Sequence, residues 1–184
     1  MTFLTALWLP ILVSAVVVFA ASSIIHMMFT YHKKDFQKLP DEDGAMNALR
    51  PLNIAPGSYS FPFSGTAKDM KDPALVEKMD KGPVAMLNVF ENGMPKMGGI
   101  LVKWFIYCLV VSIFAAYIAS HALPAGGTYL QIFRFVGCTA FIGYALATWQ
   151  GFIWFGYSFR YVFLSTFDGL IYGLLTAGVF GWLW

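Results

Sequence analysis

Apolar residues fill two long parts of the chain, and nearly all polar residues lie between them. The first apolar run, from Phe3 to Phe29, is about 25 residues long and can cross a bilayer as one helix. The second part, from Ile100 to Trp184, is long enough for three more crossings. These three helices are expected at about 100–122, 130–150 and 162–184. The pattern predicts an all-α membrane protein with four transmembrane helices.

The polar stretch, residues 31–99, is expected to fold as a small α+β insertion between the first helix, residues 1–30, and the three-helix bundle, residues 100–184. Acidic residues around Asp41 predict the start of a short helix that ends before Pro51, because acids favour a first turn and proline resists continuation.

A second helix is expected in the insertion from Pro73 to Lys81, with Asp72 as its N-cap and proline at the first helical position. The strand-like segments 59–63 and 84–90 flank this helix and predict a two-stranded ribbon. Such a ribbon is only marginally stable alone.

The distribution of charge predicts the orientation of the chain. All but three of the charged residues lie between Lys33 and Lys103. No Lys or Arg precedes the first helix, whereas Lys33 and Lys34 follow it, which indicates an uncleaved anchor and not a signal peptide. The positive-inside rule then predicts a cytoplasmic insertion with both termini outside. The aromatic segment 152–161 is expected at the cytoplasmic membrane interface.

Composition excludes several classes of protein. The chain is 58% hydrophobic and only 12% charged, which is too apolar for an ordinary soluble domain. Its net charge of +2, without a basic cluster, argues against nucleic acid as a partner. Membrane lipids and other integral membrane subunits are the expected partners. Cys108 and Cys138 lie inside predicted helices and indicate neither a disulfide nor a metal site.

Small residues recur at every fourth position of the last helix, at Gly169, Gly173, Ala177 and Gly181. This spacing places them on one face, where another backbone can approach closely. Gly143 offers a similar position on the third helix. The pattern favours a tight helical bundle.

Four ionisable residues from separate parts of the chain are expected at the same depth, near the inner edge of the membrane. They are His26, Lys103, Arg160 and Asp168. Ionisable groups within spans are costly and usually paired. The interpretation that we favour is a salt-bridged clamp between helix ends. The alternatives are a proton-transfer site, a site for an anionic lipid headgroup or a ligand pocket. Arg134 is expected to act as an interfacial anchor.

The histidines do not predict haem held by two axial ligands within one chain. His26 and His121 fall at opposite edges of the membrane, and His32 falls in the insertion. A single axial ligand to haem or to a chlorophyll-type pigment stays open, so the cofactor is undetermined. No motif indicates a set of metal ligands or catalytic residues.

Several segments resemble those of small bacterial four-span inner-membrane proteins that have no known activity. The segments are 26–28, 31–35, 38–43 and 168–178. The resemblance implies a bacterial inner membrane and no particular reaction.

These observations favour a non-catalytic accessory or scaffold subunit that packs against a larger membrane complex. A respiratory or photosynthetic complex is one candidate, suggested by the aromatic surface. The alternative is a small membrane enzyme, or a protein that binds lipid or a small molecule through the inner-edge cluster.

Overall fold

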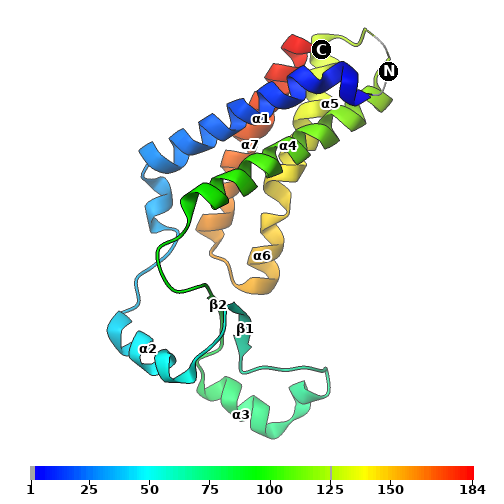
Figure 1. Cartoon of the computed structure of the whole chain (residues 1–184). Coiled ribbons are helices and arrows are strands. Elements are labelled where there is room, and N and C mark those ends of the chain that lie inside the picture. Colours follow the sequence, from blue (N-terminus) through cyan, green and yellow to red (C-terminus); the bar gives the residue numbers. More distant parts are fainter. Residues whose placement is uncertain (1–2, 125) are drawn as a thin grey trace. The chain divides into compact units, whose positions relative to one another are not determined.

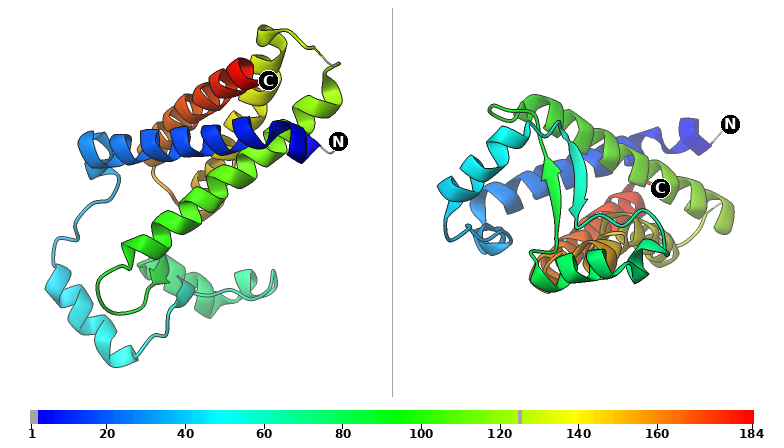
Figure 2. Two further views of the ribbon diagram at one scale, coloured as in Figure 1. Left: turned by 45° about the horizontal axis from the view of Figure 1, so that its top comes forward. Right: turned by 90° about the horizontal axis from the view of Figure 1, so that it is seen from below.

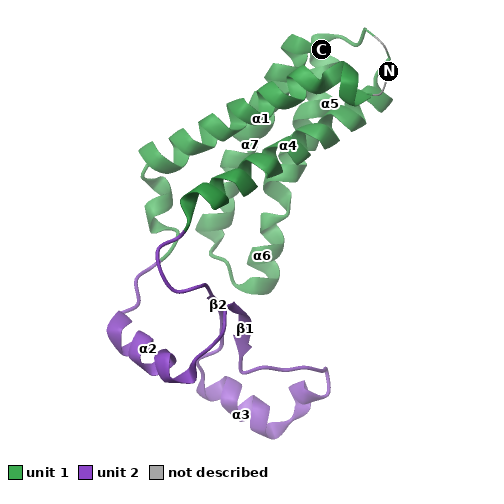
Figure 3. Cartoon of the chain, in the orientation of Figure 1, with its two compact units in different colours: residues 1–36, 96–184 green, residues 37–95 purple. Residues whose placement is uncertain are grey.

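The computed structural model describes residues 3–124 and 126–184, which form two compact units. The first unit comprises residues 1–36 and 96–184, and the second comprises residues 37–95 (Figure 3). The predicted insertion began at residue 31, but residues 31–36 belong to the first unit. The reason is that they turn back onto the helices and contact them, as described below.

The first unit contains four helices that are long and apolar enough to cross a membrane, each of 25 to 27 residues. They are α1, Phe3–Met28; α4, Met97–Ala122; the continuous helix of α5, Tyr129–Phe141, η4, Ile142–Leu146, and α6, Thr148–Phe155; and α7, Phe159–Leu183. A bilayer requires about 20 apolar residues per helix. The four helices support the prediction of a multi-pass membrane protein.

The third and fourth helices extend further toward each other than the sequence suggested. The expected interfacial segment 152–161 is divided between the end of α6, a short turn and the start of α7. Gly156 ends α6 in the left-handed conformation, with φ of 70°, and the Ser158 side chain accepts the N–H of Tyr161 to cap α7. The two caps fix a tight turn.

Two apolar cores hold the first unit together, one toward each end of the helices. One core joins the start of α1, the end of α4, the start of α5 and the end of α7, around Ile11, Ala116 and Phe180. The start of α1 and the end of α7 accordingly lie at the same end of this unit (Figure 1). The other core surrounds Val18 and Tyr172. Which side of the membrane each end faces stays a prediction.

The predicted small residues lie where the helices approach most closely. A Cβ added to Gly169 would lie 2.8 Å from Cβ of Ala145, and one added to Gly173 would lie 3.2 Å from the carbonyl oxygen of Gly137. These contacts join α7 to the α5–η4 segment. A Cβ added to Gly137 would lie 3.0 Å from Cβ of Ala177, and one added to Gly181 would lie 2.5 Å from the Tyr129 ring. A Cβ added to Gly143 would lie 3.2 Å from the side chain of Val111 on α4.

The second unit contains the elements that its local sequence predicts. Helix α2, Glu42–Leu49, begins at Asp41, and helix α3, Pro73–Lys81, begins at Asp72; each Asp accepts a backbone N–H at the helix start. Strands β1, Gly57–Phe61, and β2, Ala85–Val89, pair antiparallel, as the right-hand view of Figure 2 shows.

Two alanine substitutions on α7 should differ in their effect on the free energy of unfolding. Gly169→Ala forces a methyl group against Ala145 and should lower the free energy of unfolding by about 1–3 kcal/mol. Gly178 has no atom within 4 Å of its added Cβ, so Gly178→Ala should be neutral or stabilise the helix by up to about 1 kcal/mol. Unfolding of both variants in the same detergent measures the difference. Equal effects would mean that α7 does not pack through Gly169.

Candidate functional site

The centre of the candidate site is Asp168, a carboxylate buried in the middle third of α7. The residue is only 3% exposed. An ionised carboxylate in such surroundings loses its hydration and therefore requires hydrogen-bond donors and positive charge nearby. The residues that provide them identify the site.

Two donors come from η1, Tyr31–Lys34, a single 3₁₀ turn that follows α1. The Tyr31 hydroxyl donates to Oδ1 of Asp168 at 2.5 Å, and Nε2 of His32 lies 2.7 Å from Oδ2. Both carboxylate oxygens thus have a partner. Tyr31 and His32 are 137 and 136 positions before Asp168 in the sequence. They reach it because the turn comes directly after α1, which packs against α7.

His32 also contacts a second buried carboxylate. Its Nδ1 lies 2.5 Å from Oδ2 of Asp35, whose side chain is 4% exposed. The Arg160 guanidinium stands beside this group, with Nε 3.8 Å from Oδ1 of Asp35 and a 2.8 Å hydrogen bond to the carbonyl oxygen of Tyr31. The imidazole of His32 therefore lies between two carboxylates, and Arg160 adds positive charge at the edge.

His26, on the last turn of α1, completes the cluster. Its ring stacks on that of His32 with 4.7 Å between centroids and 15° between planes. Nδ1 of His26 lies 3.0 Å from the carbonyl oxygen of Ser22 one turn earlier. One nitrogen of each histidine and one oxygen of Asp168 all lie within 4.8 Å of one another. We call His26, His32 and Asp168 the His–His–Asp triad.

The surroundings shift two pKa values outside the membrane-spanning helices. Burial lowers the pKa of His32, but hydrogen bonds to Asp35 and Asp168, together with their negative charges, raise it by more, so the pKa lies above its ordinary value of 6.5. Burial, and then the hydrogen bond to Asp168, raise the pKa of Tyr31. Tyr31 therefore remains protonated and continues to act as a donor.

Three of the four predicted inner-edge residues lie in this cluster, namely His26, Arg160 and Asp168. Lys103 does not join them. Its side chain is exposed on α4 and has no ion pair or hydrogen bond with any residue that the structure describes. Depth along a helix does not specify the direction in which a side chain projects, and Lys103 projects away.

Three residues of the site were not predicted, namely Tyr31, His32 and Asp35. They follow α1 in sequence and were assigned to the insertion. The sequence offered one signal for them. His32 and Asp35 are three residues apart directly after a helix, a spacing that allows their side chains to meet across one turn. Nothing in the sequence shows that this turn folds back toward α7, so the three residues could not be assigned to the site.

Comparisons of the chain with protein-family models, with curated proteins and with solved structures gave no match. The resemblance to bacterial four-span proteins therefore stays a prediction, and the function has to be argued from the site itself.

The raised pKa of His32 predicts a pH-dependent stability of the protein after treatment with a chelator. A group with a raised pKa in the folded state stabilises fully below its ordinary pKa, here 6.5, and this stabilisation is lost as the pH rises through the folded value. Thermal unfolding in detergent should therefore show a melting temperature that decreases as the pH rises above 6.5 and through the raised pKa of His32. His32→Asn should remove the decrease, whereas His121→Asn, at the far end of α4, should retain it. A decrease that persists in His32→Asn would contradict the assignment.

Proposed function

We propose that this protein binds a divalent transition-metal ion through the His–His–Asp triad at the edge of its helical bundle. The ligands would be one nitrogen of His26, one nitrogen of His32 and one carboxylate oxygen of Asp168. This proposal develops the alternative function that the sequence suggested, a site for a small ligand at the inner-edge cluster.

The observation that carries the proposal is proximity: one nitrogen of each ring and one oxygen of Asp168 lie within 4.8 Å of one another. When the rings are neutral, Nδ1–H of His26 donates to the Ser22 carbonyl and Nδ1–H of His32 donates to Asp35. Each ring then has its lone pair on Nε2, one of the two ring nitrogens that can coordinate metal. In these tautomers the two rings would offer their lone pairs to an ion beside Asp168.

The groups around the triad are those that usually support metal ligands. A histidine ligand commonly donates its other N–H to a carboxylate or a backbone carbonyl, which holds the ring and increases its basicity. Asp35 and the Ser22 carbonyl occupy these two positions. A ligating carboxylate is usually hydrogen-bonded in turn, and the Tyr31 hydroxyl provides that bond to Asp168.

Binding would require the His26 ring to rotate, because it lies nearly parallel to the His32 ring and the in-plane lone pairs of two such rings do not converge on one ion. Ligand atoms at about 2.1 Å from an ion are at most about 4.2 Å apart. In a tetrahedral site the separation is about 3.4 Å, so donor atoms of the triad that are as much as 4.8 Å apart would have to approach each other by more than about 1 Å. The exposed His26 is able to move. The ion would also take the place of the proton that His32 and Asp168 share at 2.7 Å.

The donor set selects a class of metal. Imidazole suits zinc, iron, copper and nickel, whereas calcium and magnesium prefer oxygen ligands alone. Two histidines and one carboxylate leave coordination positions for water or another molecule, as in catalytic zinc and non-haem iron sites. The bound ion would supply Lewis acidity at these positions.

Substitutions of the triad should weaken metal binding to a graded extent. His26→Ala is the most informative variant, because His26 is exposed and its removal should leave the fold intact. We expect the affinity for Co²⁺ or Zn²⁺ to decrease more in His26→Ala and Asp168→Asn than in Asp35→Asn, where loss of a supporting carboxylate should weaken binding about 10–100-fold. Calorimetry and the visible spectrum of Co²⁺ measure both affinity and ligation.

His121→Ala is the matched control, since His121 is exposed and hydrogen-bonds within its own helix, as His26 does, but belongs to the other end of the unit. Binding should be unchanged in this variant. An affinity that His26→Ala leaves unaltered would exclude the triad as the metal site.

The role of accessory subunit in a larger membrane complex stays a second proposal, supported by the surface of the second unit. Phe63, Phe90 and Met94 are 73%, 81% and 91% exposed in a unit that contains most of the charged residues of the chain. Isolated apolar residues on a surface are ordinary, but several large ones in one small unit favour a partner or a membrane surface.

Purification from the native membrane in a mild detergent tests this second proposal. We expect an integral membrane protein to co-purify in a fixed ratio with the tagged chain, and an absorption spectrum would reveal any pigment. Phe90→Ser should reduce the recovery of that partner, whereas the adjacent Glu91→Gln should not. Recovery of the chain alone, in monomeric form, would contradict the role of subunit.

A further inference from the structure

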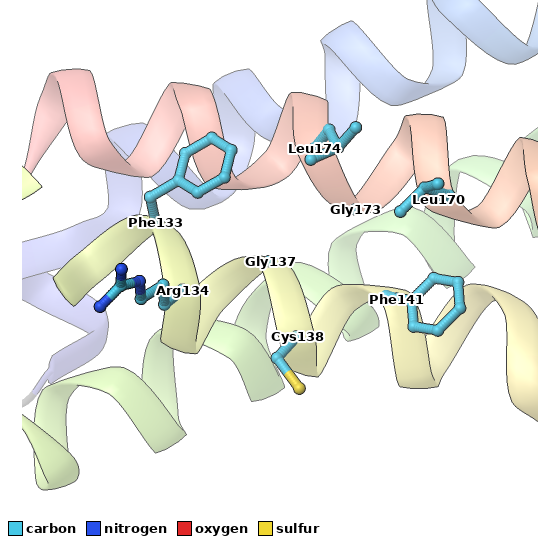
Figure 4. Close-up of a pocket in the computed structure, with 8 residues that line it drawn as sticks. All are labelled: Phe133, Arg134, Gly137, Cys138, Phe141, Leu170, Gly173 and Leu174. Atoms are coloured by element: carbon cyan, nitrogen blue, oxygen red, sulfur yellow. The ribbon is translucent and has the colours of Figure 1, made fainter. Parts of the chain in front are cut away.

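A shallow apolar groove runs along the outside of the helical unit between α5 and α7 and shares no residue with the His–His–Asp triad. It encloses about 230 Å³ and is lined by Phe133, Arg134, Gly137, Cys138, Phe141, Leu170, Gly173 and Leu174 (Figure 4). This volume is below the range of about 300–1,000 Å³ that is typical of pockets for drug-sized ligands. The groove suits a single narrow apolar chain.

The shape of the groove follows from the packing of its two helices. Gly137 and Gly173 face each other so closely that an added Cβ on Gly173 would lie 3.2 Å from the Gly137 carbonyl oxygen. Because neither residue has a side chain, the helix contact leaves a furrow. Leucine and phenylalanine side chains form its walls (Figure 4).

One cation, Arg134, lies at the end of the groove nearer the start of α5. Its side chain is exposed and forms no ion pair or hydrogen bond with the residues in the described ranges 3–124 and 126–184. Arg134 is five residues beyond Tyr129, the first residue of α5, or about 7.5 Å along the helix axis. A long side chain at this depth extends its charge to the headgroup level.

The groove thus combines an unpaired cation near the headgroup level with an apolar furrow that continues toward the middle of the span. Phe141, at the other end of the lining, is seven residues or about 10 Å deeper than Arg134. A phospholipid with an anionic headgroup has the matching distribution of charge and apolar length. We propose that this groove binds one anionic phospholipid, with its phosphate on Arg134 and part of one acyl chain between α5 and α7.

Native mass spectrometry tests this proposal directly. The full-length protein would be exchanged from vesicles of equal parts phosphatidylglycerol and phosphatidylcholine into a mild detergent, and the retained lipids counted. We expect one retained phosphatidylglycerol per chain. Arg134→Gln should reduce its retention about tenfold, because a charge-assisted hydrogen-bonded pair is lost.

Two further variants separate the groove from general attraction to anionic lipid. Lys103→Gln removes another exposed, unpaired cation of the same unit and should leave retention unchanged. Leu174→Trp places a larger side chain in the groove and should reduce retention of both lipids, while the melting temperature shows whether the protein remains folded.

Three results would overturn the proposal. They are equal retention of phosphatidylglycerol by the wild type and Arg134→Gln, equal losses from Arg134→Gln and Lys103→Gln, or equal retention of phosphatidylcholine and phosphatidylglycerol by the wild type. Crosslinking of a benzophenone attached at Cys138 to a second protein chain would instead show that protein, and not lipid, covers this face.

Discussion

The buried carboxylate of Asp168 is the constraint on which the rest of the site depends. A charge that is 3% exposed within an apolar helix has to be neutralised by the protein. Its two oxygens are bound by Tyr31 and His32, which belong to a turn at the end of the first helix. The interaction therefore joins the first and last of the four long apolar helices and, in doing so, creates the site.

The same arrangement would make proton binding and the proposed metal binding competing states of one centre. With His32 protonated, its cation lies between two carboxylates and balances part of their charge. With His32 neutral, one nitrogen of each histidine lies within 4.8 Å of an oxygen of Asp168 and could accept an ion in place of the proton. The proposed metal site and the clamp that the sequence suggested would therefore use the same residues.

Much of the fold could be predicted from local sequence. The apolar runs predict the four long helices, and the Asp72–Pro73 pair predicts the start of α3 because a cap and a fixed φ act within one turn. The end of α6 and the start of α7 were less predictable, since the aromatic residues of 152–161 suit both a membrane interface and a helix.

The site could be predicted only in part because its residues meet through tertiary folding. A costly charge within a span singled out Asp168 from sequence alone, whereas its partners depend on the direction in which the chain turns after α1. Lys103 was placed by depth, and depth contains no information about the face of a helix. Two residues close together in sequence, His32 and Asp35, were missed because a loop assignment concealed their contact with the helices.

X-ray absorption spectroscopy of the zinc-loaded protein tests the metal centre most directly. We expect nitrogen and oxygen ligands at about 2.0–2.2 Å, with the scattering of two imidazole rings in the wild type and one in His26→Ala. Sulfur at about 2.3 Å, or the same two rings in His26→Ala, would contradict this expectation.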